Sequence, residues 1–372
     1  MNQKVSTIAR NAAVRALYAR KGALGPRLIK WVFGLETYEV SALGSFTGRR
    51  VEIEGEPGPL VGGSISSSGS VKRLSFRPDL PFHVALVENA ALSLNRRGGF
   101  ALHEGKLLTR TTPTRSTPRI VFGGEPVATE CVQFEAAVAL KRPQKVETIP
   151  AGIYVGSLAP HNWFHWIIDT LPVIHFLRHL PPEFRNYPVL LPSIGEHKRD
   201  WHESLKVALH GRPVKVVDAG TFTNVRALVM TEGASTAFPR PLKASQQFGR
   251  IFYRDNMLTT FADAVRDKAM PAKLATKPER RLFIGRKSRG GREYNQGEIF
   301  DVAGEYGFEL VFLEDLPFLD SVRLFNEAQI VIGPHGAGFA NILFAQTGTP
   351  TLVWTWNDKR GDNWYESLFA AL

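Results

Sequence analysis

Cysteine is almost absent from the sequence, which has only Cys131 among 372 residues. A single cysteine excludes an intramolecular disulfide and favours a reducing compartment. Cys131 lies in an apolar stretch, so we interpret it as a buried, inert thiol. No apolar run approaches the roughly 18 residues that span a bilayer, and basic residues interrupt any secretion-signal core at the N-terminus. The sequence therefore predicts a cytoplasmic protein.

Acidic residues are missing from the first 30 positions, which carry seven Lys or Arg. Apolar residues recur there at helical spacing, from Ile8 to Tyr18. Two interpretations stay open: a solvated or docked helical tail, and an amphipathic segment resting peripherally on the anionic inner face of a membrane. The whole chain has a formal net charge of +11, which indicates an anionic partner. Because no recognised nucleic-acid-binding motif is present, nucleic acid is not the expected partner.

The chain is too long for one ordinary core, which predicts two or three domains. Residues 45–145 show short strand-like runs between Gly, Pro and Asn turns. From about residue 150, apolar strands alternate with helices, as in a parallel sheet covered on both faces. This part ends in a long helical stretch over residues 244–270, followed by a polar linker over 271–281. The alternation then returns, so we expect two doubly wound units that face each other across a cleft.

The segment 331–345, VIGPHGAGFANILFA, joins a buried strand to an expected helix through three glycines. Glycine lets the backbone approach a ligand closely, and the unpaired amides of Gly336 and Gly338 at a helix start favour an anion such as a diphosphate. His335 at the apex would donate to a phosphate oxygen, and Asn341 would contact phosphate or ribose. The alternative is a tight structural turn with a surface histidine. We call residues 333–338 the glycine elbow.

A second candidate segment follows the strand RLFIG. Its four cations crowd one loop, and they are Arg286, Lys287, Arg289 and Arg292. Four cations repel one another unless an anion neutralises them, and Arg is the preferred residue for bidentate phosphate recognition. The topology aims this loop at the same cleft as the glycine elbow. The alternative is a solvated basic loop.

A third candidate segment is PHNWFHWIIDTLPVIHFL, in which His161, His165 and Asp169 recur at intervals of four on one helix face. A His165–Asp169 pair suits a general base, because the carboxylate orients the imidazole and raises its basicity. Zinc ligation by His161 and His165 is an alternative, although no third ligand is evident. A structural histidine also stays open. A hydrolase is not expected, because no Gly-x-Ser-x-Gly turn is present.

Taken together, the three segments resemble glycosyltransferase family 61, which includes capsular-polysaccharide-type enzymes. The resemblance covers roughly residues 80–372, most firmly 150–357. The matching residues are Asn162, His165, Asp169 and Pro172, then Arg286, Arg292, Asn295 and Glu298, then His335, Gly336, Ala337, Gly338 and Asn341.

The resemblance implies a GT-B-like α/β fold of two Rossmann-like domains. It implies an inverting transfer of a hexosyl, pentosyl or N-acetylhexosaminyl group from a nucleotide diphosphate donor, often UDP-linked. A cell-surface polysaccharide or a lipid-linked oligosaccharide is the expected acceptor. Catalysis would fall to His165 or Asp169, with His161 and Asn162 on the acceptor side. The expected donor-binding residues are Arg286, Arg292, Asn295, His335, Gly336, Ala337, Gly338 and Asn341.

The expected organisation is a basic tail (1–44), an acceptor-side domain (45–275) and a donor-binding domain (276–372). The chain ends at NWYESLFAAL, where a further strand and a crossing helix are expected, so the last domain would be a fragment or a minimal version. This makes a catalytically inactive nucleotide- or glycan-binding protein of the same fold the alternative function. The oligomeric state is left open, and a homo-oligomer is compatible with the sequence.

Metal-dependent enzymes that stabilise a departing diphosphate commonly carry Asp-x-Asp, and this chain has none. Electrostatic stabilisation by the arginine loop and the helix start can serve instead. We therefore expect neither a metal nor a cofactor.

Overall fold

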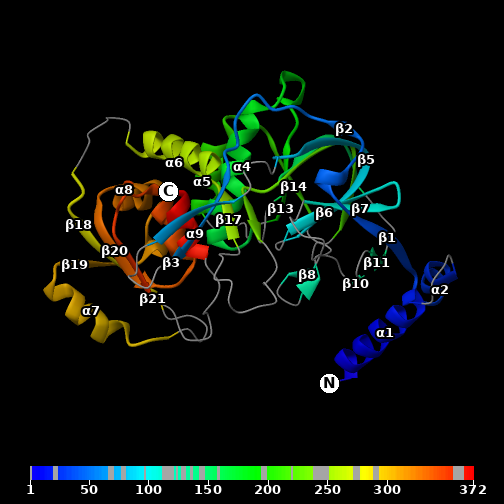
Figure 1. The fold of residues 1–372 in the computed structure, drawn as a ribbon, viewed down its shortest axis with the longest axis horizontal. Coiled ribbons are helices and arrows are strands. Elements are labelled where there is room, and N and C mark those ends of the chain that lie inside the picture. The colour runs from blue at the N-terminus through cyan, green and yellow to red at the C-terminus, as the bar shows by residue number, and fades with distance from the viewer. Residues whose placement is uncertain are drawn as a thin grey trace.

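The computed structural model of the chain describes residues 2–19, 24–65, 71–76, 81–95, 98–110, 121–122, 125–126, 131–134, 137–141, 147–156, 160–193, 199–218, 221–237, 251–270, 277–287, 293–354 and 364–372. Helices and several sheets pack together in these residues, so the expected α/β class is confirmed (Figure 1).

The largest sheet is mixed and has the strand order β10-β11-β1-β7-β6-β5-β15-β12-β13-β14, with β2 paired to β5. Its strands are β1 (Leu35–Ala42), β2 (Arg49–Arg50), β5 (Val84–Asn95), β6 (Gly98–His103), β7 (Lys106–Thr109), β10 (Cys131–Gln133), β11 (Ala137–Lys141), β12 (Glu147–Tyr154), β13 (Val189–Pro192), β14 (Val214–Val217) and β15 (Phe222–Thr231). Strands β15, β12, β13 and β14 are parallel, whereas β5 runs antiparallel to β15. The β-rich part and the first α/β part of the sequence therefore share one continuous sheet.

The last part of the chain forms a separate parallel sheet in the order β19-β18-β20-β21. These strands are β18 (Arg280–Ile284), β19 (Phe308–Val311), β20 (Ala328–Pro334) and β21 (Thr351–Trp354). On one face, Phe283 packs with Ala303 of helix α7 (Gln296–Glu305). On the other face, Leu282 belongs to the same core as Phe325 of helix α8 (Phe318–Asn326). Successive residues of β18 thus point to opposite helices, as a doubly wound unit requires.

The other strands form two further sheets, which have the strand orders β16-β17-β3-β4 and β8-β9. They consist of β3 (Leu60–Ile65), β4 (Val71–Phe76), β8 (Val121–Phe122), β9 (Glu125–Pro126), β16 (Ser235–Ala237) and β17 (Ile251–Arg254). The long helix expected over residues 244–270 is wrong in part, because 251–254 is strand β17 and helix α6 begins only at Asp255. Ile251, Phe252 and Tyr253 are all buried, and such an apolar, partly aromatic run suits a sheet covered on both faces.

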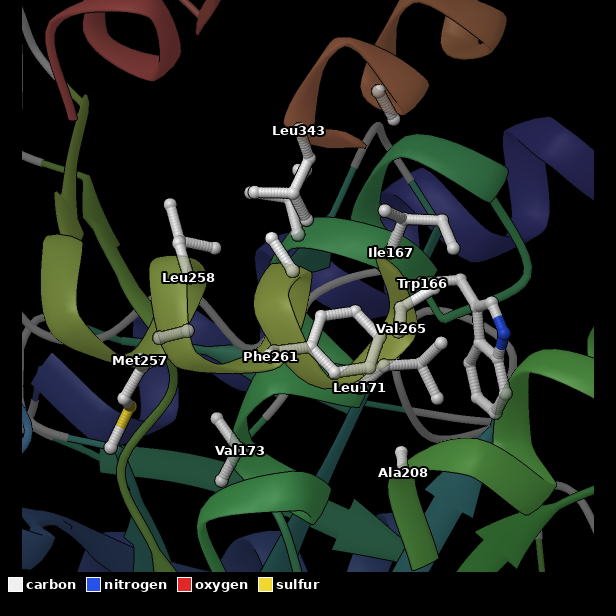
Figure 2. Packing of buried hydrophobic residues seen from close by; sticks show 14 of the residues in the cluster. Trp166, Ile167, Leu171, Val173, Ala208, Met257, Leu258, Phe261, Val265 and Leu343 are labelled. Atoms are coloured by element: carbon white, nitrogen blue, oxygen red, sulfur yellow. The ribbon is translucent and has the colours of Figure 1, made fainter. Parts of the chain in front are cut away.

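One large hydrophobic core runs through the middle of the molecule and reaches both α/β parts. Besides α8, the helical elements that contribute to it include α3 (Trp163–His165), the π-helical turn η2 (Trp166–Thr170), α4 (Leu171–Phe176), α5 (Arg199–Leu209), α6 (Asp255–Ala269) and the 3-10 helix η6 (Ala337–Phe344). In α6, Leu258, Phe261 and Val265 recur at helical spacing and face Leu171 and Leu343 (Figure 2). The helix that carries the His-Asp motif is therefore held by buried packing on several sides.

The remaining helices are short or lie near the chain ends. They are α1 (Asn2–Ala19), α2 (Leu24–Phe33), η1 (Leu43–Ser45), η3 (Leu177–His179), η4 (Pro182–Phe184), η5 (Leu313–Asp315) and α9 (Trp364–Ala371). Helices α1 and α2 project from one end of the molecule, whereas α9 packs against β3, β4 and β17 (Figure 1). Among the helices of the described residues, none is long and apolar enough to cross a bilayer.

Candidate functional site

The arginine loop and the glycine elbow follow neighbouring strands of the last sheet. β18 pairs with β19 on one side and with β20 on the other, so the direction of strand addition reverses between β18 and β20. Such a switch point leaves a crevice beyond the carboxyl ends of the strands, where open α/β sheets bind ligands. Arg286 is the second residue of the loop after β18, and β20 leads into His335.

The two loops touch through the Arg286 side chain. Its Nη2 donates a hydrogen bond of 2.9 Å to the backbone oxygen of His335. The Arg286 backbone N–H donates to Gln296 Oε1 at 2.6 Å, which fixes the start of the loop against α7. A side-chain carbon at Gly336 would collide with Arg286 Nη2. The arginine loop and the glycine elbow are therefore in contact at Arg286.

The glycine elbow is shaped by close packing. The His335 N–H donates to Trp354 O at 2.7 Å, which joins the elbow to β21. A side-chain carbon at Gly333 would lie 2.7 Å from Ile284 O, and one at Gly338 would lie 2.9 Å from Leu313 Cδ1. Gly336 has extended backbone, with φ of −174°. These glycines are therefore required for close approach and not for left-handed backbone.

The element that follows the elbow is the 3-10 helix η6, where the sequence analysis expected an α-helix. Asn341 within it is only 2% exposed, and its Nδ2 donates to Gly338 O at 2.9 Å. Its Oδ1 is buried with no hydrogen-bond partner among the described residues. In this arrangement the Asn341 amide braces the elbow from within the core.

The other expected donor-side residues occupy different surroundings. Asn295 lies at the N-terminal boundary of α7, where its Nδ2 donates to Glu298 Oε2 at 2.8 Å. Lys287 is exposed and pairs with Asp315. Ala337 is the first residue of η6 and is half-buried. Arg289 and Arg292 lie outside the described residues.

Tyr365 of helix α9 is a site residue that the sequence analysis missed. Its hydroxyl donates to the backbone oxygen of Gly336, and its ring lies edge-on to His335 with the centroids 4.9 Å apart. Burial raises the pKa of the Tyr365 hydroxyl above its ordinary value, so the group remains a neutral donor. Helix α9 (Trp364–Ala371) thus contacts both the glycine elbow and strands β3, β4 and β17.

The predicted His165–Asp169 pair is formed. His165 Nδ1 lies 2.5 Å from Asp169 Oδ2, and the side chains are 17% and 0% exposed. With Nδ1–H donated to the carboxylate, His165 Nε2 keeps a lone pair that can accept a proton. A buried carboxylate bonded to one nitrogen of a partly exposed imidazole is an arrangement that general bases use.

The local geometry of the helix positions His165 and Asp169 relative to each other. The Asn162 Oδ1 caps α3 by accepting from the Phe164 N–H at 2.9 Å, so the Asn162 side chain has a structural task at the helix start. From Trp166 to Thr170 the helix widens into a π turn, in which the Leu171 N–H bonds to Trp166 O. Pro172 follows and has no N–H to donate, which favours such a departure from α geometry. His161 precedes the cap and is half-buried.

Arg110 is a second residue that the sequence analysis missed, and it supplies positive charge near Asp169. Burial lowers the pKa of Arg110, while Asp169 and then Glu232 oppose that shift. Its Nη1 donates to Ser235 O at 3.2 Å, at the start of β16. Asp169 Oδ1 is buried without a hydrogen-bond partner among the described residues, so nearby positive charge offsets the cost of burying this carboxylate.

The His-Asp pair and the glycine elbow are neighbours. Helix α3 lies against η6. Phe164, beside His165, contacts the Tyr365 ring at a centroid distance of 5.3 Å, and Tyr365 in turn contacts His335. Tyr365 therefore links the two motifs through ring contacts.

Metal ligation is a separate question, raised by His161 and His165. Within the part of the chain that the structure describes, no three His, Cys, Asp or Glu side chains group closely enough to hold a metal ion.

Comparison with known proteins identifies the family. The sequence model described as glycosyltransferase 61 matches residues 163–352, just over half of the chain, and this range holds His165, Asp169, Arg286 and His335. A search of curated proteins finds no match to the chain. Because its family match spans the His-Asp motif, the arginine loop and the glycine elbow, the chain belongs to glycosyltransferase family 61 and is a glycosyltransferase.

Proposed function

We propose that this glycosyltransferase moves a sugar from a nucleotide diphosphate donor, with UDP as the expected nucleotide, to a hydroxyl of an acceptor glycan with inversion at the anomeric carbon. The observation that carries the proposal is the contact of Arg286 with His335 at the switch point of the last sheet. Guanidinium, imidazole and backbone amides at one crevice are the donor set that a diphosphate requires.

The donor diphosphate would lie between the arginine loop and the glycine elbow. Arg286 is half-buried, and its Nη2 bond to His335 O leaves other N–H groups of the fork for phosphate oxygens. The His335 ring and the amides of Ala337 and Gly338 would contribute further donors. Asn295 and Arg292, of which Arg292 lies outside the described residues, are the other donors that we propose. As the bond from the anomeric carbon to phosphate breaks, negative charge grows on the diphosphate, and these groups stabilise it.

The acceptor hydroxyl would be activated by His165. His165 Nε2 takes the hydroxyl proton while the acceptor oxygen bonds to the anomeric carbon, and the electron pair of the broken bond leaves with the diphosphate. Asp169, 2.5 Å from Nδ1, stabilises the imidazolium that forms. A single displacement of this kind inverts the anomeric carbon. In this scheme the chain's own cations stabilise the departing diphosphate without a metal ion.

A GT-B-like division into a donor side and an acceptor side is part of this proposal. The large sheet has its own switch point at β12, which is flanked by β13 on one side and β15 on the other. The loops after β12 and β15 approach closely there, because a side-chain carbon at Gly233 would collide with Gly156 O and lie 3.0 Å from Arg110 Nη1. We place the acceptor on this side, with His161 and Asn162 at its edge. A polysaccharide or a lipid-linked oligosaccharide is the acceptor class that we favour.

The test is a thermal-shift panel of UDP-, GDP-, dTDP- and CMP-linked sugars, with and without EDTA, repeated on Arg286→Ala. The proposal expects stabilisation by one nucleotide class that EDTA does not remove and that the variant loses. NMR of the transferred sugar then reports inversion. Stabilisation of Arg286→Ala equal to that of the wild type would refute the donor site, whereas donor binding without any turnover would indicate an inactive nucleotide-binding protein.

A further inference from the structure

Helix α2 carries an exposed apolar stripe. Leu24, Leu28, Trp31 and Val32 are 71%, 37%, 84% and 52% exposed. Their spacing of four, three and one residues places them on one face of the helix. Large apolar side chains exposed together in this way indicate an interaction surface.

The opposite face of α2 is already occupied by the protein. Ile29 is fully buried together with Val14 of α1 and Leu35 of β1. Tyr18 of α1 stacks on Phe134, with the ring centroids 3.9 Å apart. These contacts hold α1 and α2 on the sheet. The exposed stripe of α2 takes no part in this packing.

The charge of this end of the molecule is entirely positive before Glu36. The first 33 residues contain no Asp or Glu, and their basic residues are Lys4, Arg10, Arg15, Arg20, Lys21, Arg27 and Lys30. Arg27 is exposed on α2 next to the stripe, whereas Lys30 is exposed farther round the helix and pairs with Glu36 at 3.0 Å. An apolar stripe on a helix pair rich in cations matches a surface that is anionic outside and apolar just beneath.

We propose that α1 and α2 dock the protein peripherally on an anionic lipid bilayer, with Leu24, Leu28, Trp31 and Val32 entering the boundary between headgroups and acyl chains. Trp31, the most exposed of the four, would lie at the headgroup level that tryptophan prefers. Each Lys or Arg near an anionic surface strengthens binding by about fivefold. A second copy of the chain is a poorer occupant, because two such faces would bring like charges together.

The docking surface and the proposed donor site lie at opposite ends of the molecule. In Figure 1, α1 and α2 project at one end of the longest axis, whereas β18, β20 and β21 lie toward the other. Docking would therefore leave the donor site open to solution. The docking proposal can be tested without measuring turnover.

The experiment is flotation of the full-length protein with phosphatidylcholine vesicles that contain or lack phosphatidylglycerol. We expect binding to the anionic vesicles and little binding to the neutral ones. Salt at 0.5 M should weaken this binding, because the screening length is roughly twofold shorter than in physiological salt. Leu28→Glu/Trp31→Glu should lower the anionic-vesicle affinity by about tenfold or more, since each substitution removes an apolar group and adds a repelled charge.

The matched control is Val214→Glu/Val216→Glu, which places two acids at exposed apolar positions of the edge strand β14. It should bind vesicles like the wild type. Circular dichroism melting checks that both variants are folded. Equal affinity of the two double variants, or no binding by the wild type, would overturn the proposal. So would a concentration-dependent dimer that only Leu28→Glu/Trp31→Glu dissolves, because that result makes the surface a contact between copies.

Discussion

Replacing Arg286 with alanine is the change that probes the donor site most sharply. In the folded protein it removes the 2.9 Å hydrogen bond from Nη2 to His335 O. The loss of one such bond, with its acceptor half-exposed, should lower the free energy of unfolding by about 1 kcal/mol. The loss of a charged donor aimed at the departing diphosphate should lower kcat/KM for the donor by about 10²–10³, or roughly 3–4 kcal/mol of transition-state stabilisation.

The disparity between these two magnitudes makes the experiment decisive. Steady-state kinetics with saturating acceptor should show the large loss, while urea unfolding shows the small one. Arg281→Ala is the matched control, because Arg281 lies on the same strand but is exposed, and its guanidinium bonds to Tyr306 O and Gln329. It should leave kcat/KM unchanged. Arg286→Lys should fall between the two, because lysine keeps the charge but not the planar fork. A tenfold or smaller kinetic loss in Arg286→Ala would show that the reasoning about the diphosphate is wrong.

Three further predictions test other parts of the site and the fold. His165→Ala should lower kcat by about 10²–10⁴ while calorimetry finds donor affinity unchanged, and a wild-type kcat would exclude His165 as the base. Tyr365→Phe should reduce donor affinity by about fivefold, since it removes the hydroxyl that holds Gly336 O, and unchanged binding would contradict that support. Burial, with Arg178 next, lowers the pKa of His175 from 6.5 to about 3, so the unfolded chain binds a proton there that the folded protein does not. The free energy of unfolding should therefore fall as pH drops below about 6.5, with this group contributing a slope that approaches 1.4 kcal/mol per pH unit, and His175→Asn should show a shallower decline in urea titrations.

Sequence periodicity predicts much of the last sheet because each of its strands is short, apolar and followed by a helix. RLFIG and QIVIG become β18 and β20, and the loops that follow them meet as parallel topology requires. The i, i+4 spacing likewise brings His165 and Asp169 together. In both cases local pattern and general topology are sufficient, since no long-range side-chain detail is needed.

Other features depend on contacts between distant segments, which periodicity does not encode. The strand at residues 251–254 exists because Tyr253 pairs with Val61, almost two hundred positions earlier. Arg110 reaches the neighbourhood of Asp169 only because β7 and β15 belong to one sheet. Tyr365 contacts Gly336 only because α9 packs against strands β3, β4 and β17. A lone arginine and a lone tyrosine carry no sequence signal for these positions.

The local geometry of the glycine elbow is predicted by the sequence only in part. The sequence predicts a helix start and glycines that allow close approach of the backbone, and the helix that forms, η6, is a 3-10 helix. The glycines are small because Ile284, Leu313 and Arg286 press against them. Tertiary packing sets this geometry, and single-segment propensity cannot supply it.

The central claim is that one diphosphate bridges the arginine loop and the glycine elbow. A double-mutant cycle of Arg286→Ala and His335→Ala, with UDP affinity measured by calorimetry, tests it directly. If both side chains bind the same diphosphate, each substitution weakens UDP binding by about tenfold or more, and the double variant loses less than the product of the two because the residues are coupled. UDP affinities that remain at the wild-type level in both single variants would contradict the claim.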